Sequence, residues 1–241
     1  MRAKYYVGTS GWVYPHWRNV FYPPKLVQSK WLEFYTDHFP SVELNYSFYR
    51  LPSERSFSNW RDTSPDGFCY AVKVSRFITH MKRLKDVAEP LETFINRARN
   101  LSEKLGPLLF QLPANMRRND ELLEHFLTAL PREFRHVIEF RHETWFDEKV
   151  FEILRRYNTG FCILDMPDLP CPLLATSDFA YFRFHGSSML YLSSYSDDEL
   201  DKWAKRIVLL AEDLNDTYVY FNNDAGGFAV RNAQTLYRKL S

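Results

Sequence analysis

Eight short apolar runs that end in polar residues recur along the chain, and stretches with helical spacing separate them. Such an alternation is typical of βαβ units and a parallel sheet. The runs cover residues 6–9, 42–45, 71–75, 108–111, 137–141, 162–165, 181–185 and 218–222. Eight is the strand number of a (β/α)8 barrel, which commonly fills about 250 residues as one domain. We therefore predict an α/β fold, a single TIM-type barrel spanning residues 1–241.

The stretches between the runs carry the 3.6-residue spacing of amphipathic helices. The clearest extends over residues 196–214, where Leu200 and Ile207 lie on one face. Ser196 and Glu199 have the spacing of a capping box at its start. The same spacing recurs over residues 91–105, 122–130 and 229–240.

One stretch departs from this alternation. Between the sixth and seventh runs, Pro167, Pro170 and Pro172 fix φ and remove backbone donors. We therefore expect the sixth helix of the barrel to be missing or shortened. A doubly wound open sheet is the main alternative, and it usually carries a G-x-G-x-x-G turn after an early strand. No such turn occurs in the sequence, so we favour the barrel.

Charge and cysteine content restrict the partners and the compartment. Lys and Arg number 31 against 30 Asp and Glu, so no overall field draws the chain to nucleic acid or to an anionic membrane. Cys69, Cys162 and Cys171 form no C-x-x-C pair. No run approaches the roughly 18 apolar residues of a membrane span, and no apolar leader precedes the first strand. We expect a cytoplasmic protein; its oligomeric state stays open, because apolar helix faces serve barrel packing and dimerisation alike.

Polar side chains come in pairs at the ends of five runs. Residues two apart in a strand share a face. The pairs are Glu43 with Asn45, Lys73 with Ser75, Glu139 with Arg141, Arg183 with His185, and Tyr220 with Asn222. Inward positions of a barrel normally hold branched apolar residues. Five polar pairs therefore predict one polar mouth at the C-terminal ends of the strands, where enzymes of this fold keep their active sites.

The cations of this mouth favour a small anionic ligand. Lys73, Arg141 and Arg183, with Arg76 nearby, would supply donors, and a guanidinium fits a carboxylate or phosphate with two parallel hydrogen bonds. Asn45 would add an amide. The alternative is internal neutralisation, because buried cations need partners whether or not a ligand exists. The available carboxylates are those of Glu43, Glu139 and Asp165.

Two loops extend the predicted binding site. The eighth run continues into Asn222, Asn223 and Asp224, and then into two glycines before a helix. The loops after the last two strands of barrels often bind phosphate at a helix N-terminus, although the glycines could simply make a tight turn. After the first run, Trp12 and Tyr14 could stack on a sugar or a base, or pack the loop over the barrel, which is the commoner role of such clusters.

For proton transfer we select Glu139 and His185 first, and Glu43 and Asp165 second. Burial in a crowded mouth can move the pKa of a carboxyl group toward the working pH. The same atoms suit Mg, Mn or Zn ions. A divalent metal is not favoured, because no H-E-x-x-H motif and no spaced His/Cys set occurs. The cofactor therefore stays unknown.

Seven segments, in order, resemble the signatures of a known family. They are residues 8–14 (GTSGWVY), 42–49 (VELNYSFY), 79–80 (TH), 111–113 (QLP), 139–142 (EFRH) with Trp145, 183–186 (RFHG) and 221–224 (FNND). Over residues 5–232 the chain is similar to the YecE-like family, the domain of unknown function 72. The resemblance implies a TIM-barrel-like fold with a polar pocket at the strand C-terminal ends, and it implies no reaction. Two departures, Phe184 where Leu is commoner and Thr144 where Ser is common, remove no charged group.

Three functions are compatible with this pattern. The first is an enzyme acting on a small anionic molecule, phosphorylated or sugar-like, which the cations hold while Glu139 and His185 move protons. The second is metal-assisted phosphodiester cleavage in nucleic acid, against which the near-neutral net charge counts. Its ligands would be Glu43, Glu139, Asp165, His185 and Asp224. The third is a non-catalytic small-molecule binder.

Overall fold

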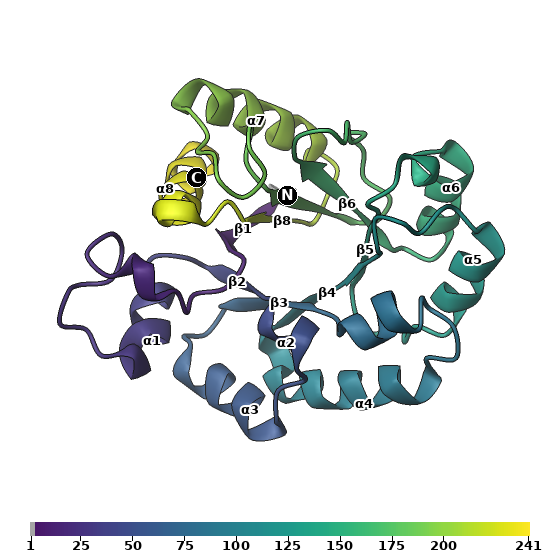
Figure 1. The fold of residues 1–241 in the computed structure, drawn as a ribbon, viewed down its shortest axis with the longest axis horizontal. Coiled ribbons are helices and arrows are strands. Elements are labelled where there is room, and N and C mark those ends of the chain that lie inside the picture. The colour runs from purple at the N-terminus through teal and green to yellow at the C-terminus, as the bar shows by residue number, and fades with distance from the viewer. Residues whose placement is uncertain (1–2) are drawn as a thin grey trace.

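The computed structural model describes residues 3–241, which form a barrel of eight parallel strands (Figure 1). The strands are β1 (Lys4–Thr9), β2 (Ser41–Leu44), β3 (Cys69–Lys73), β4 (Leu105–Gln111), β5 (His136–Glu139), β6 (Gly160–Asp165), β7 (Phe179–Phe184) and β8 (Asp216–Phe221). Their order is β1-β8-β7-β6-β5-β4-β3-β2. The predicted TIM-type barrel is confirmed. Met1 and Arg2, which precede the first predicted strand, lie outside the described residues.

Helices connect the strands, and the longer ones surround the sheet (Figure 1). They are α1 (Trp31–Thr36), α2 (Tyr46–Tyr49), α3 (Glu54–Thr63), α4 (Ala88–Ala98), α5 (Asp120–Thr128), α6 (Glu148–Arg156), α7 (Asp197–Leu210) and α8 (Phe228–Leu240). The predicted capping box opens α7: the Glu199 N–H donates to Ser196 Oγ, and the Ser196 N–H donates to the Glu199 carboxylate at 2.7 Å. None of the helices within residues 3–241 is both long and apolar enough to cross a membrane.

Short helical turns and one gap complete the connections. The turns lie at Pro15–Trp17, Gln28–Lys30, Phe77–Met81, Arg99–Lys104, Glu143–Trp145 and Ala225–Gly227. Between β6 and β7, residues 166–178 contain no helix. The predicted loss of the helix after the sixth strand is thus confirmed, and the prolines of that stretch account for it.

Alternation along the strands separates two apolar clusters. The larger joins the outward strand positions to the helices, and Val42 and Leu44 belong to it. The buried members of the smaller all come from strands and fill the interior; they are Cys69, Ala71, Leu109, Val137, Cys162, Leu164, Phe179, Tyr181, Tyr218 and Tyr220. Since side chains of a strand alternate between its faces, the next inward positions toward the C-terminal ends are Lys73, Gln111, Glu139 and Arg183.

A tyrosine hydroxyl bridges β1 and β2, between which the ladder of backbone hydrogen bonds is interrupted. We call this gap the seam of the barrel. β1 and β2 lie side by side without pairing. The hydroxyl of Tyr35 accepts from the Thr9 N–H on β1 at 2.9 Å and donates to the Ser41 carbonyl on β2 at 3.1 Å. Gly8 is required at this seam, because an added Cβ would lie 2.0 Å from the Ser41 carbonyl oxygen. The barrel is therefore nearly closed, with a side chain in place of the last ladder.

Candidate functional site

A buried network of charged side chains closes the interior near the C-terminal ends of the strands. Arg183 on β7 holds the carboxylate of Glu43 on β2 from two sides, with Nη2 2.8 Å from Oε1 and Nε 3.0 Å from Oε2. Its Nη1 lies 2.7 Å from Oε2 of Glu139 on β5. Arg141 pairs with the other oxygen of Glu139. Two guanidinium groups therefore balance two carboxylates, which is the internal neutralisation that the sequence left open.

Neutral donors complete the network. The carboxylate of Glu43 accepts from Ser10 Oγ at 2.8 Å and from the Tyr181 hydroxyl at 2.6 Å. The carboxylate of Glu139 accepts from Gln111 Nε2 at 2.6 Å. Buried charges are tolerated when they are paired and fully hydrogen-bonded. The buried charges of the network are thus paired and hydrogen-bonded within the protein, without a ligand.

Glu139 is held in its ionised form. Burial alone would raise the pKa of Glu139, but the charges of Arg141 and Arg183 outweigh burial and hold this pKa well below its usual range. A group whose pKa lies far from the working pH transfers protons poorly. Glu139 therefore fits the role of a fixed counter-ion better than the proton-transfer role predicted for it.

His185 lies beside the network as a neutral imidazole. Burial, reinforced by the charges of Arg183 and Arg141, lowers the pKa of His185 well below its ordinary value. Arg141 Nη2 lies 3.0 Å from His185 Nε2, and a guanidinium can only donate. The ring proton is then on Nδ1, 3.3 Å from the side-chain amide of Asn222. We assign the amide oxygen of Asn222 to face this proton on the basis of the hydrogen-bond pattern.

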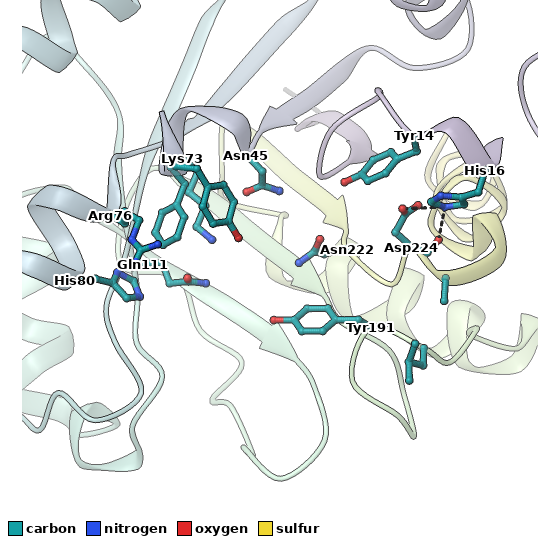
Figure 2. A pocket seen from close by; sticks show the side chains of 14 residues that line it. Tyr14, His16, Asn45, Lys73, Arg76, His80, Gln111, Tyr191, Asn222 and Asp224 are labelled. Atoms are coloured by element: carbon teal, nitrogen blue, oxygen red, sulfur yellow. Dashed lines mark hydrogen bonds and ion pairs between the residues drawn. The ribbon is translucent and has the colours of Figure 1, made fainter. Parts of the chain in front are cut away.

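A cavity of about 720 Å³ opens at the C-terminal ends of the strands (Figure 2). Gln111 and Asn222, which contact Glu139 and His185, belong to its lining. The ion network therefore lies one layer beneath the cavity. Figure 2 shows Lys73, Arg76, His80 and Gln111 on one side and Tyr14, His16 and Asp224 on the other, with Asn222 and Tyr191 between them.

Lys73 is the buried cation of the cavity that the network leaves without a counter-ion. Its side chain extends inward from the end of β3, and the residue is only 8% exposed. Its Nζ lies 4.1 Å from the centre of the Phe48 ring, and no hydrogen-bond or ion-pair partner of Nζ occurs within residues 3–241. Burial and the charge of Arg183, partly offset by the attraction of Glu139, lower the pKa of Lys73 to about 8. A fraction of Lys73 is therefore a neutral amine near physiological pH.

Arg76 and His80 follow Lys73 along the same side of the cavity. Arg76 is exposed, and His80 Nδ1 lies 2.9 Å from Thr79 Oγ1. Burial, with the charge of Lys73, lowers the pKa of His80. The sequence pattern places Arg76 near the predicted cations but does not select His80 or Gln111 as site residues. Counting two residues on from the inward Leu109 would have identified Gln111, whereas Arg76 and His80 lie in an irregular turn where strand periodicity gives no guidance.

Asp224 and His16 form a pair on the opposite side. Asp224 Oδ2 lies 3.1 Å from His16 Nε2, and Oδ1 accepts from the Trp17 indole N–H at 2.6 Å. Burial raises the pKa of Asp224 to about 6, although the hydrogen bond from Trp17 and the charge of His16 oppose the shift. A carboxyl group with a pKa near neutrality suits proton transfer. Asp224 also lines the cavity, as expected for a residue of the predicted binding site.

Asn45 and Tyr14 also line the cavity, as predicted. Asn45 Nδ2 and the Tyr14 hydroxyl both donate to the Ser10 carbonyl, at 3.3 and 2.6 Å. The Oδ1 atom of Asn45 is buried and has no partner within residues 3–241. An unpaired buried acceptor costs about 1–3 kcal/mol. Asn45 Oδ1 is therefore an unsatisfied acceptor at the wall of the cavity.

Asp165 does not belong to the mouth. Its neighbours Cys162 and Leu164 are inward residues of β6, so Asp165 faces outward toward the helices. Burial raises the pKa of Asp165, and the side chains of Tyr195 and Trp203 partly offset this shift. The structure therefore does not bring Asp165 together with the other residues selected for proton transfer. The two-residue periodicity that selected the other site residues would have excluded it.

Asn223 and Trp12 support the loops and do not line the cavity. The buried Asn223 donates through Nδ2 to the Ser193 carbonyl and to Asn232 Oδ1, each at 2.9 Å. Trp12 packs edge-on against Trp60, with ring centres 5.6 Å apart. Trp12 instead lines a neighbouring pocket together with Tyr14 and Asn45. The predicted ligand contacts of Asn223 and Trp12 stay predictions.

The glycines after Asp224 have a conformational role. Gly226 and Gly227 have φ values of 63° and 75°, in the left-handed region. An added Cβ on Gly227 would lie 2.6 Å from Cγ1 of Val20. The tight-turn interpretation explains both residues, and phosphate binding at this turn stays a prediction.

The five residues considered as metal ligands do not form a metal site within residues 3–241. Glu43 and Glu139 are both ion-paired with Arg183. Asp165 faces outward, and the carboxylate of Asp224 pairs with His16. Within residues 3–241, no group of three or more His, Cys, Asp or Glu side chains is arranged to hold a metal ion.

Comparison with known proteins gives a consistent set of relatives. Residues 6–241 match the family model described as "Protein of unknown function DUF72". The chain is 26% identical to UPF0759 protein YunF of Bacillus subtilis over 98% of this chain and 94% of that protein. It is 32% identical to UPF0759 protein YecE of Escherichia coli over 58% of this chain and 50% of that protein. The crystal structure of a DUF72 family protein (TM1631) from Thermotoga maritima is similar with a TM-score of 0.90 and 34% identity, covering 98% of this chain and 99% of that one.

Proposed function

The chain belongs to the DUF72 family of proteins of unknown function, and we propose that it is an enzyme acting on a small anionic organic molecule in the mouth cavity. One observation carries the proposal: two cations, Lys73 and Arg76, line the cavity against one carboxylate, that of Asp224. The buried carboxylates of Glu43 and Glu139 are balanced by Arg183 and Arg141. Neither carboxylate pairs with Lys73, which faces the cavity beside Arg76.

The two sides of the cavity suit a ligand with two kinds of polar group. Arg76 offers a planar fork for a carboxylate or phosphate, with Lys73 and Gln111 nearby. Elsewhere in the lining of the cavity are two hydrogen-bond acceptors, the carboxylate of Asp224 and the unpaired Oδ1 of Asn45. A volume of about 720 Å³ lies within the usual range for small-molecule sites. These features favour a hydroxylated organic anion, such as a sugar-like acid or phosphate ester.

Two lining groups are suited to proton transfer near neutral pH. The pKa of Asp224 is about 6 and that of Lys73 about 8, and shifted values of this kind concentrate at active sites. We assign to this pair the proton-transfer role that the sequence assigned to Glu139 and His185. The buried pair instead positions Gln111 and Asn222 at the base of the cavity.

The proposal is tested by turnover in mixtures of small phosphorylated and carboxylated metabolites, followed by NMR. We expect the wild-type protein to consume at least one compound, and Arg231→Gln, an exposed control on α8, to consume it equally fast. Lys73→Met and Arg76→Gln should lose this activity. Equal consumption by Lys73→Met would refute the proposal. A ligand that binds tightly and stays unchanged would identify a non-catalytic binder instead.

A further inference from the structure

We propose that Lys73 is a nucleophilic amine that forms an imine with the carbonyl group of a small anionic oxo compound, an oxo acid or a phosphorylated aldehyde or ketone. The inference rests on the proposed function for the anionic part of the ligand. It adds that the amine of Lys73 is the reacting group, and it narrows the substrate class to anions that carry a carbonyl group.

A comparison with the second buried lysine shows what is unusual about Lys73. Lys104 is 5% exposed, and its Nζ donates to the carbonyl oxygens of Arg61 and Ser64 at 2.7 and 2.6 Å. That is the arrangement expected of a structural lysine, whose buried charge is satisfied by acceptors. Lys73 is buried to a similar degree, yet its Nζ meets the face of an aromatic ring and the open cavity. Its position therefore has no structural explanation of the kind that Lys104 has.

The surroundings of Lys73 favour the neutral, nucleophilic amine. A lysine becomes reactive when it is desolvated or placed beside another cation. Both conditions hold, because the residue is 8% exposed, and the charges of Arg183 and Arg141 act with burial to lower its pKa. The nearby glutamates do not cancel this effect, since both are committed to the arginines. The ion network thus keeps both carboxylates paired with guanidinium groups.

The reaction is balanced with groups that are present. The Nζ lone pair of Lys73 attacks the carbonyl carbon and forms a carbon–nitrogen bond. The oxygen takes the proton that the nitrogen releases and becomes the carbinolamine hydroxyl. It then leaves as water after taking one more proton from solvent, and the protonated imine remains. The anionic group of the substrate lies meanwhile toward Arg76.

Reductive trapping tests this inference with two carbonyl compounds and one control anion. Pyruvate carries both groups, propanal carries only the carbonyl, and lactate carries only the carboxylate with a hydroxyl. The protein is incubated with pyruvate or propanal and sodium cyanoborohydride, and modified lysines are located by peptide mass spectrometry. We expect both compounds to label Lys73 ahead of Lys104 and of exposed lysines such as Lys205. The yield at Lys73 should rise with pH around a midpoint near 8, whereas exposed lysines should respond nearer their ordinary pKa of about 10.4.

Variants separate this inference from the proposed function. Arg76→Gln should reduce labelling by pyruvate about tenfold or more and leave labelling by propanal unchanged, while Lys205→Arg should alter neither. If neither compound labels Lys73 preferentially, the imine proposal is wrong, whatever anions bind. If lactate still stabilises the wild-type protein in thermal unfolding but not Arg76→Gln, the anion site stands without the imine. If propanal labels Lys73 but no anion binds, the amine is reactive and the proposed substrate class is wrong.

Discussion

Arg183 and Glu43 form a fully buried, two-pronged ion pair between β7 and β2, strands that are not neighbours in the sheet. The same guanidinium reaches Glu139 on β5. One side chain therefore ties three strands together beneath the cavity. This arrangement fixes the base of the site and also removes both glutamates from direct contact with a ligand.

Replacing Arg183 should strongly destabilise the barrel. In Arg183→Met, two buried carboxylates lose a shared partner, and breaking a buried pair on one side typically costs about 3–5 kcal/mol. Urea unfolding of the variant checks this. The exposed pair of Arg155 with Glu148 offers the control, because Arg155→Met should change the free energy of unfolding by about 1 kcal/mol or less. Equal effects of the two substitutions would contradict the account.

The stability of the protein should fall in acid in a way that depends on Glu139. The folded-state pKa of Glu139 lies well below its ordinary value of 4.5. Its contribution is therefore fully present above pH 4.5 and is lost as the pH falls through the folded pKa. In urea unfolding between pH 7 and pH 3, the free energy of unfolding should fall less steeply with pH in Glu139→Gln than in the wild type. Glu152→Gln, an exposed control on α6, should keep the wild-type slope; an unchanged slope in Glu139→Gln would disagree with the structure.

Periodicity predicts much of this architecture but not the pairing of its charges. The eight strands and the inward direction of Glu43, Lys73, Glu139 and Arg183 follow from the two-residue repeat. The choice of carboxylate partner for Arg183 depends on how the barrel closes and on the level of each residue along the barrel axis. No local sequence pattern contains that information. It is harder still to predict that Lys73 has no ion-pair partner, because this depends on Glu43 and Glu139 being paired with arginines.

The misplaced residues have physical explanations of the same kind. Asp165 ends an apolar run, as Gln111 does, but it has the opposite parity. Asn223 follows β8, where its amide holds the Ser193 loop against α8. Neither role is visible from residue type, because a strand end supplies polar residues to both of its faces.

Lys73→Met should stabilise the fold near neutral pH while it abolishes function. The folded-state pKa of Lys73 is about 8, below its ordinary value of 10.5, so the charged lysine opposes folding. This penalty is fully present below pH 8 and disappears as the pH rises toward 10.5. Unfolding at pH 7 should therefore show a gain of the order of 1–3 kcal/mol that shrinks by pH 10. The exposed control Lys205→Met should have little effect. A destabilised Lys73→Met at pH 7 would show that the ammonium group has a partner after all.

Tyr35→Phe should weaken the seam of the barrel. The substitution removes the hydroxyl that joins the Thr9 N–H to the Ser41 carbonyl, and leaving buried groups unpaired costs about 1–3 kcal/mol. Hydrogen exchange at the Thr9 amide should accelerate, with urea unfolding recording the loss of stability. Tyr157→Phe is the control, because its hydroxyl makes only a 3.4 Å contact with Glu124. Unaltered exchange at Thr9 would mean that the seam is closed by other contacts.

Calorimetric titration of the wild-type protein with small phosphorylated and carboxylated compounds at low ionic strength is the sharpest test of the anion site. We expect at least one compound to bind with one-to-one stoichiometry. Arg76→Gln should weaken that binding about tenfold or more, as the loss of a charge-assisted hydrogen bond implies, and Arg231→Gln should leave it unchanged. Equal weakening by the two substitutions, or binding that Arg76→Gln does not affect, would contradict the assignment of the cavity as an anion site.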